Sequence, residues 1–379
     1  MVEIAAAAQP VLFHEVLGAG GRKLGFALLN AEKSLNSLSL QMIRLLDARL
    51  RVWSRDNSIA CVVLHGAGEK AFCAGGDVRA LYHAMRENPS VAVNAQALAF
   101  FSEEYRLDYL IHTYPKPILV WGSGIVMGGG LGLFAGASHR VVTENSRIAM
   151  PEISIGLFPD VGGSWFLQRM PGKLGLFISL TAVPLNGPDT LSIGLANHLV
   201  SAAERHSVFD HLAAAPWHSD AASNRAVLSA LLQQFAATQA TAPTSNVERH
   251  AATIESLCAG TTLPQVYDAI CGYAGEDAWL KRGAATLKAG SPTTAALIWE
   301  LRQRAQALPL GGVFRMELIV ALQCCAHPDF AEGVRALLID KDHAPHWKPG
   351  AMADVTPEWI SEHFVAPAWP QGASPLADL

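Results

Sequence analysis

Two acidic residues near the middle of the chain have neighbours suited to chemistry. Glu152 follows Pro151, which removes a backbone donor and stiffens the chain at that point. Asp160 comes eight residues later, after a Gly-containing turn, and precedes Gly162 and Gly163. A solvated loop glutamate and an ordinary Pro-Asp-Val-Gly turn are the alternative interpretations.

A run of glycines upstream of these acids could supply hydrogen-bond donors. The run Gly128 to Gly130 follows a β-branched stretch, Ile118 to Val120, that indicates a buried strand. The apolar segment Leu131 to Ala137 then predicts a helix, so the glycines would lie at its N-terminus. Exposed N–H groups at such a place favour an anion, or an oxygen that becomes anionic during reaction. Donors beside two carboxylates in an apolar setting suggest acyl-group chemistry.

Several predicted elements must position these groups. Residues 11 to 29 indicate a hairpin around Gly18-Ala19-Gly20-Gly21. A helical stripe of Met42, Leu45, Leu46, Leu50 and Trp53 follows, with Ser37 or Ser39 as its N-cap. A short strand at Cys61 to Leu64 and a strand-like run at Arg147 to Met150 complete a recurring strand, strand, helix rhythm. That rhythm is consistent with a coiled stack of ββα units.

The second half of the chain has a different character. Residues 236 to 247, AATQATAPTSNV, are small and polar and indicate a linker. Helical periodicity beyond them, at 248 to 259, 293 to 307, 312 to 326 and 331 to 338, predicts an α-helical C-terminal region. We therefore expect a core at 1–205, a helical connection and linker at 206–247, and the helical region at 248–379.

Composition sets further limits. A chain of 379 residues exceeds what one core usually holds, and its net charge of -5 gives no basic footprint for nucleic acid. Six cysteines without CxxC pairing indicate reduced core residues, and with no signal peptide evident in MVEIAAAAQP they favour the cytoplasm. Ile118 to Ser138 carries no charge over 21 residues, but its seven glycines favour strand, loop and buried helix over a membrane span.

Three ordered motifs together resemble the crotonase (enoyl-CoA hydratase/isomerase) superfamily. They are KAFCAGGDV at 70–78, the stretch from Trp121 to Gly163, and DFAEGVRALLIDKDHAPHWKP near the C-terminus. Within the superfamily, the pattern MPExxIGLFPDVGG is similar to that of 3-hydroxyisobutyryl-CoA hydrolases, and the likeness runs from about Leu12 to Phe364. The resemblance implies a ββα superhelix with an α-helical C-terminal region and an acyl-CoA thioester as substrate.

The resemblance also implies roles for residues. The amides of Gly76 and Gly129 would point at the thioester oxygen, and the position of Glu152 is the catalytic carboxylate, acting as nucleophile or as base on water. Asp160 stands where hydratases usually carry glycine, so it is a departure toward the hydrolase pattern and would orient water or bind the substrate hydroxyl. Glu104 matches a substrate-binding glutamate, although a solvent-facing helix glutamate is the alternative.

For CoA itself, the resemblance implies that the loop from Lys70 to Arg79 meets the adenine and ribose end through backbone groups. The substrate-binding residues expected there are Ala74, Asp77, Val78 and Arg79. Cys73 has no recognisable base nearby, and His65 and His139 show no metal-ligand spacing. We therefore expect no metal and no cofactor apart from the CoA of the substrate, no nucleic-acid or membrane partner, and a possible homo-oligomer.

Gly132 bears on the choice of reaction. Many hydratases have a second catalytic glutamate at this place, needed when water adds across a double bond, and here no side chain exists. The sequence thus favours hydrolysis of a short 3-hydroxyacyl-CoA thioester, with 3-hydroxyisobutyryl-CoA and valine breakdown as the best match. The alternatives are a hydratase or isomerase on the same fold, and a catalytically silent CoA-binding protein.

Overall fold

The computed structural model describes residues 9–87, 93–236 and 243–379, and the chain divides into two compact units. Unit 1 contains Met1–Gly76, Leu107–Ile148 and Leu185–Ser245, and unit 2 contains Asp77–Arg106, Ala149–Pro184 and Asn246–Leu379. The units interleave along the chain, and the consecutive ranges 1–205, 206–247 and 248–379 stay a prediction. Residues 237–242 of the predicted linker lie outside the described residues.

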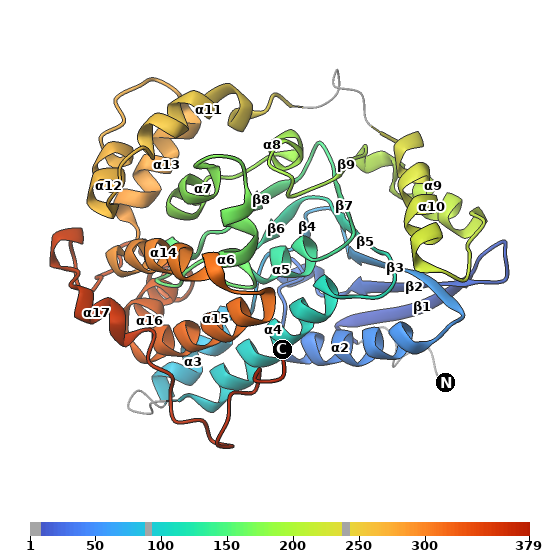
Figure 1. Cartoon of the computed structure of the whole chain (residues 1–379), viewed down its shortest axis with the longest axis horizontal. Helices are drawn as coiled ribbons and strands as arrows, with labels where there is room; N and C mark the ends of the chain where they lie inside the picture. Colours follow the sequence, from blue (N-terminus) through green and yellow to red (C-terminus); the bar gives the residue numbers. More distant parts are fainter. Residues whose placement is uncertain (1–8, 88–92, 237–242) are drawn as a thin grey trace. The chain divides into compact units, whose positions relative to one another are not determined.

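Two sheets form the frame of unit 1 (Figure 1). The larger has the order β1 (Val11–Leu17), β2 (Lys23–Leu29), β3 (Ile59–Gly66), β5 (Ile118–Gly122), β7 (His139–Val142) and β9 (His198–Leu199). The smaller contains β4 (Ala71–Cys73), β6 (Ile125–Met127) and β8 (Arg147–Ala149), whose last residue is the first of a unit 2 segment. β1 and β2 form the predicted antiparallel hairpin, and from β2 to β9 the larger sheet is parallel.

The strand order confirms the predicted superhelix of ββα units. The first strand of each repeat, β3, β5 or β7, adds to the larger sheet, and the second, β4, β6 or β8, adds to the smaller one. The uncharged segment from Ile118 to Ser138 forms β5, β6 and α5, as expected from its glycines. However, α5 spans Gly129–Ala135 and not the predicted Leu131 to Ala137. Two glycines therefore lie inside the first turn of the helix.

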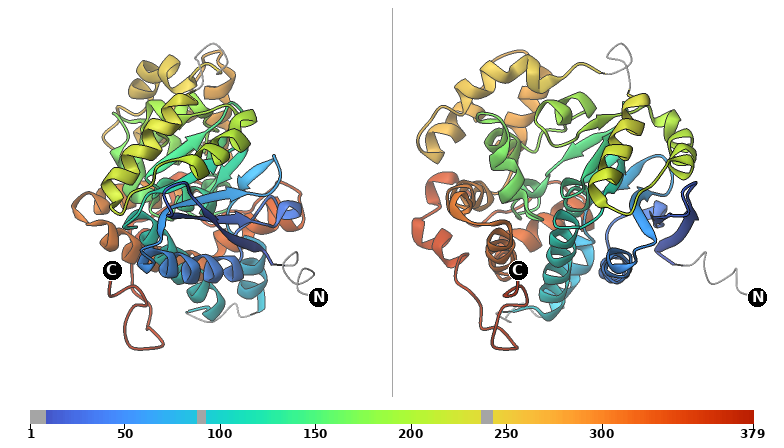
Figure 2. Two further views of the ribbon diagram at one scale, coloured as in Figure 1. Left: turned by 90° about the vertical axis from the view of Figure 1, so that its right-hand side faces the viewer. Right: turned by 45° about the vertical axis from the view of Figure 1, so that its right-hand side comes forward.

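Helices cover the larger sheet of unit 1. α2 (Leu40–Arg55) begins at Ser39, whose side chain accepts a hydrogen bond from Met42 N, and buries Trp53 in the space left by the missing side chain of Gly25. Leu45 of the predicted stripe is only half-buried, and Ile43 takes a core position. α9 (Arg205–Ala214) and α10 (Ala221–Gln234) share one apolar core with the larger sheet. Figure 2 shows these two helices lying across the strands of that sheet.

Unit 2 is mainly helical. Its principal elements are α3 (Val78–Glu87), the first part of α4 (Ala95–His112), η2 (Glu152–Ser154), α6 (Gly163–Phe166), α7 (Leu174–Thr181), α11 (Asn246–Leu257), α12 (Leu263–Cys271), α13 (Ala278–Ala289), α14 (Pro292–Arg304), α15 (Leu310–Ala326), α16 (Pro328–Val334), the π-helical turn Arg335–Ile339 and α17 (Pro357–Glu362). The helical C-terminal region is confirmed, although the sequence patterns did not predict α12, α13 and α17. Within the described residues no single helix passes the test for a membrane span, and Leu310–Ala326 with Pro328–Ile339 passes only as a pair bent by 75°.

Candidate active site

The predicted backbone donors lie in a loop and at the start of a helix of unit 1, and these two segments touch. A Cβ atom on Gly130 would lie 2.3 Å from the carbonyl oxygen of Cys73, so only glycine lets α5 approach the end of β4 so closely. Gly75, with φ of 116°, would place a Cβ 3.4 Å from the carbonyl oxygen of Met127. The structure therefore brings the loop that contains Gly76 beside the start of α5.

Both predicted donors are compatible with an oxyanion site. Gly129 is the first residue of α5, and N–H groups in the first turn have no acceptor within their own helix. Leu38 N donates to the Gly75 carbonyl oxygen at 2.8 Å, a bond that does not involve the Gly76 amide. Because α5 has only seven residues, these N–H groups and not a long helix dipole would supply the stabilisation.

Four carboxyl side chains are buried together in unit 2. They are Glu104 of α4, Glu152 of η2, Asp160 of the loop before α6, and Glu317 of α15, and we call them the acid cluster. None is more than 4% exposed. The structure thus buries the predicted Glu104, Glu152 and Asp160 together, and the alternative of a solvated glutamate is wrong for Glu104 and Glu152. Asp160 does lie in a turn, as its alternative interpretation had it, but its side chain is buried.

Burial dominates the electrostatics of the acid cluster. Desolvation raises the pKa of Glu152 well above its ordinary value, and the nearby Asp160 raises it further. The pKa of Glu104 is raised by the same cause and by the charges of Asp160 and Glu152. Because like charges close together in a low dielectric cannot all ionise, the cluster holds protons near neutral pH.

Asp160 has the most specific set of contacts. Tyr105, which is fully buried, donates its hydroxyl to Asp160 Oδ2 at 2.7 Å. Burial raises the pKa of Asp160 to about 7, while the Tyr105 hydrogen bond opposes that rise. The chain turns sharply after Asp160, with φ of 52° at Val161 and 85° at Gly162. A carboxyl that titrates near pH 7 can exchange protons with a reacting water or hydroxyl group.

Two buried oxygens of the acid cluster have no hydrogen-bond donor within the described residues. Within the described part of the chain, Glu104 Oε1 and Glu152 Oε2 are buried and accept no hydrogen bond. Buried polar atoms are normally satisfied, and exceptions call for an explanation such as a ligand or a water. A bound substrate hydroxyl or an attacking water would provide the missing donor.

Residues of the predicted CoA loop have varied settings. Ala74 donates its N–H to the Leu35 carbonyl oxygen at 3.1 Å. Asp77 Oδ1 accepts from Ala80 N at 3.2 Å, so its side chain caps α3, which begins at Val78. Arg79 is exposed. The substrate-binding roles of these residues stay predictions.

Sequence reasoning missed Tyr105 and Glu317. Tyr105 adjoins Glu104 in the chain, and its proximity to Asp160 comes only from folding. Glu317 gives a clearer signal, since it is the only acidic residue of α15 in the apolar sequence LGGVFRMELIVALQCCA. An isolated acid in such a run indicates a buried functional or structural carboxyl.

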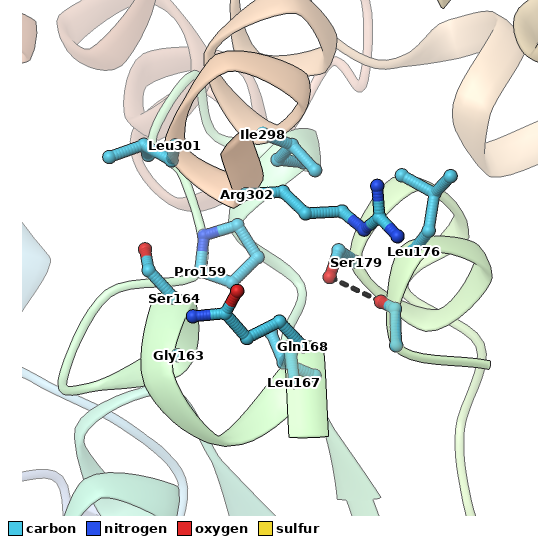
Figure 3. A pocket seen from close by; sticks show the side chains of 11 residues that line it. Pro159, Gly163, Ser164, Leu167, Gln168, Leu176, Ser179, Ile298, Leu301 and Arg302 are labelled. Carbon is cyan, nitrogen blue, oxygen red and sulfur yellow. Dashed lines mark hydrogen bonds between the residues drawn. The ribbon is translucent and has the colours of Figure 1, made fainter. Parts of the chain in front are cut away.

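Two cavities lie in unit 2. The smaller, of about 30 Å³, lies against Gly163 and Ser164 and is otherwise lined mainly by apolar side chains, with the Arg302 side chain across it (Figure 3). A volume of this size holds only one or two water molecules. The larger, of about 330 Å³, is lined by Ser154, Gly290 and Leu337 among others, and has the size of a ligand pocket. No group of three or more His, Cys, Asp or Glu residues in the described ranges is placed to hold a metal ion.

Comparisons with known proteins identify relatives of this chain. A family model described as enoyl-CoA hydratase/isomerase matches residues 24–364. The chain is 38% identical over 358 residues to the mitochondrial 3-hydroxyisobutyryl-CoA hydrolase of Danio rerio, covering 94% of this chain and 90% of the relative. For the corresponding Homo sapiens protein the identity is 35% over 341 residues, covering 90% and 86%.

Solved structures show the same fold. A carnitinyl-CoA dehydratase from Mycobacterium thermoresistibile is 33% identical with a TM-score of 0.83, covering 96% of this chain and 98% of that one. An enoyl-CoA hydratase from Rhodobacter sphaeroides is 30% identical with a TM-score of 0.80, covering 94% and 98%. The prediction of a cytoplasmic location is contradicted, because the curated relatives are mitochondrial proteins. Reduced cysteines, on which that prediction rested, do not distinguish these two compartments.

Proposed function

Because the chain belongs to the enoyl-CoA hydratase/isomerase family, we propose that it hydrolyses 3-hydroxyisobutyryl-CoA to 3-hydroxyisobutyrate and CoA. The observation that carries this proposal is the burial of Glu152 and Asp160 in one acid cluster, while position 132 is glycine. Hydrolysis needs one carboxylate, an oxyanion site and a leaving thiolate. Valine breakdown is the metabolic context that this substrate implies.

The proposed reaction proceeds through a tetrahedral intermediate. Glu152 either attacks the thioester carbon directly or takes a proton from the water that attacks it. The carbonyl electron pair moves to oxygen, and the N–H groups of Gly76 and Gly129 stabilise the resulting oxyanion. When the intermediate collapses, the C–S bond breaks and the thiolate of CoA leaves and accepts a proton. On the direct route the acyl group is then an anhydride with Glu152, and water hydrolyses it to release the acid and restore the carboxylate.

Burial raises the pKa of Glu152, so its carboxylate, once ionised, is a stronger base than an exposed glutamate, which supports the water route. In this proposal, Asp160 and Glu104 orient the water or the 3-hydroxyl group of the substrate. The unpaired Glu104 Oε1 gives that hydroxyl an acceptor.

A second candidate function is hydration or dehydration of an enoyl-CoA on the same fold. The observation in its favour is that the similar solved structures are a carnitinyl-CoA dehydratase and an enoyl-CoA hydratase. That reaction asks for two placed acid/base groups, and Asp160 or Glu104 would have to replace the carboxylate absent at Gly132. A silent CoA-binding protein, the third candidate, gives no reason for a costly buried acid cluster.

One assay separates these functions. The purified protein is mixed with a short 3-hydroxyacyl-CoA, a saturated acyl-CoA and crotonyl-CoA, and free thiol and enoyl absorbance are followed together. We expect rapid thiol release from the 3-hydroxyacyl thioester and little loss of the enoyl absorbance. Rapid consumption of crotonyl-CoA without release of thiol would establish the hydratase instead. If neither thiol release nor loss of enoyl absorbance is seen, the protein is the silent CoA-binding protein.

A further inference from the structure

The loop that carries Asp160 is strained. Val161 has φ of 52°, in the left-handed region, which a β-branched residue adopts only at a cost of about 1–3 kcal/mol. Gly162 follows with φ of 85°, and Gly163 N donates back to the Asp160 carbonyl oxygen at 2.7 Å. A strained turn of this kind persists only where its surroundings hold it.

Glu317 provides that hold. Its Oε2 accepts from Gly162 N at 2.8 Å and its Oε1 accepts from Ser164 N at 2.9 Å, so both carboxylate oxygens are engaged by the turn. These N–H groups belong to the start of α6 and have no acceptor within that helix. Glu317 is fully buried in α15, so the two amides replace the water that its carboxylate has lost.

Tyr105 contacts the side chain of Asp160 directly. Its hydroxyl donates to Asp160 Oδ2, and its ring packs near those of Phe101 and Phe314. Asp160 is thus held by Glu317 of α15 through the turn that follows it, and by Tyr105 of α4 through its side chain. We infer that Glu317 and Tyr105 are positioning residues that set the place and the protonation of Asp160, an inference that rests on the proposed function of Asp160.

The two residues should act on the protonation of Asp160 in opposite directions. Burial is the main cause of its raised pKa, and the Tyr105 hydroxyl lowers that pKa. Loosening the turn would admit water around Asp160 and relieve its desolvation, so losing Glu317 should lower the pKa of Asp160. Losing the Tyr105 hydroxyl should raise it. The titratable groups that face Asp160 are Glu104 and Tyr105 of α4, Glu152 of η2, and Glu317, Cys324 and Cys325 of α15.

The test measures kcat and KM for thiol release from 3-hydroxyisobutyryl-CoA between about pH 5 and 9. In Glu317→Gln one of the two N–H groups loses its acceptor and faces an amide NH2 group. We expect kcat to fall about tenfold or more, KM to stay within about threefold, and the acid limb of kcat/KM to move to lower pH by about one unit. In Tyr105→Phe the acid limb should move to higher pH. Glu276→Gln, on a fully exposed side chain, is the matched control and should behave as the wild type.

Several outcomes would overturn the inference. A folded Glu317→Gln with the wild-type pH profile would do so, as would shifts of the same sign in both variants. If Glu317→Gln does not fold, the double variant Val161→Gly with Glu317→Gln relieves the strain, since glycine tolerates φ of 52°. It should recover stability yet keep the lowered kcat and the shifted limb. Asp160→Asn with wild-type turnover would refute the proposed role of Asp160 itself, and would be recognised separately.

Discussion

At the scale of residues, the acid cluster combines burial with mutual repulsion. Desolvation is the largest cause of the raised pKa of each of its members, and charges of neighbouring acids add to it for Glu104, Glu152 and Glu317. Hydrogen bonds work against the rise at Asp160 and Glu317. The resulting pKa values, about 7 for Asp160 and about 8 for Glu317, suit the exchange of protons near neutral pH that hydrolysis of a thioester by water requires.

Glu152→Gln tests the central carboxylate. The amide keeps the shape of the side chain and much of the affinity for CoA, but it can act neither as nucleophile nor as base. We expect thiol release to fall about 1,000-fold, near the lower cost of removing one member of a catalytic triad, with KM changed little. Steady-state thiol assays check this, and a folded variant that retains a tenth of wild-type turnover would exclude Glu152 from the chemistry.

The same burial makes a prediction about stability. Asp160 has a folded-state pKa of about 7, above its ordinary value of 3.8, so the folded protein binds the extra proton between these values. The stability that the folded protein gains from this proton is therefore fully present below about pH 4 and is lost as the pH rises to 7 and beyond. The expected slope is about 1.4 kcal/mol of unfolding free energy per pH unit for one such group.

Urea unfolding at pH 5, 6 and 7 measures that slope. Asp160→Asn should flatten it, because the amide does not titrate, whereas Glu276→Gln should leave it as in the wild type. Equal slopes in the wild type and in Asp160→Asn would show that Asp160 ionises at its ordinary pKa.

At the scale of elements, α5 and the end of β4 approach each other closely in unit 1. Gly130→Ala would place a methyl group 2.3 Å from the carbonyl oxygen of Cys73, a backbone atom that cannot swing aside. We expect a loss of about 1–3 kcal/mol in stability, as for overpacked cores, and a lower kcat in the folded fraction because the Gly129 amide shifts. Thermal unfolding and thiol assays check both effects. Gly350→Ala, whose Cβ would meet only the Trp347 carbonyl oxygen at 3.6 Å, is the control.

Local patterns explain which elements were predictable. Alternating apolar runs around Gly18 to Gly21 predicted the β1–β2 hairpin, and Ser39 was a recognisable N-cap. The start of α5 was misplaced by two residues because glycine has a low helix propensity, and here tertiary contact with Cys73 overrides it. The missed α12 and α13 belong to a region where the motifs gave no guidance.

The candidate site was predictable only where its residues share a motif. Glu152 and Asp160 lie within one short pattern of the resemblance, so the sequence identified both. Tyr105 and Asp160 are 55 positions apart, and Gly162 and Glu317 are 155 apart. Neither periodicity nor composition encodes such pairings, which depend on how α4 and α15 pack in unit 2.

At the scale of the whole molecule, the segment near 236 to 247 tests the predicted organisation. Its small, polar composition predicts exposure, and the chain passes from unit 1 to unit 2 between Ser245 and Asn246. We expect limited proteolysis to cleave there first, giving fragments that mass spectrometry locates. Protection of this segment, with early cleavage inside 120 to 200, would contradict the boundary.

The interleaving of the two units has a consequence for synthesis on the ribosome. Unit 1 has all of its segments once Ser245 has been made, but unit 2 still lacks Asn246–Leu379. Glu104, Glu152 and Asp160 are by then present without Glu317, which belongs to that last segment. A nascent chain therefore carries the acids before it carries the residue that fixes the Asp160 turn, and we expect catalytic competence to arise late, after the α15 segment has left the exit tunnel.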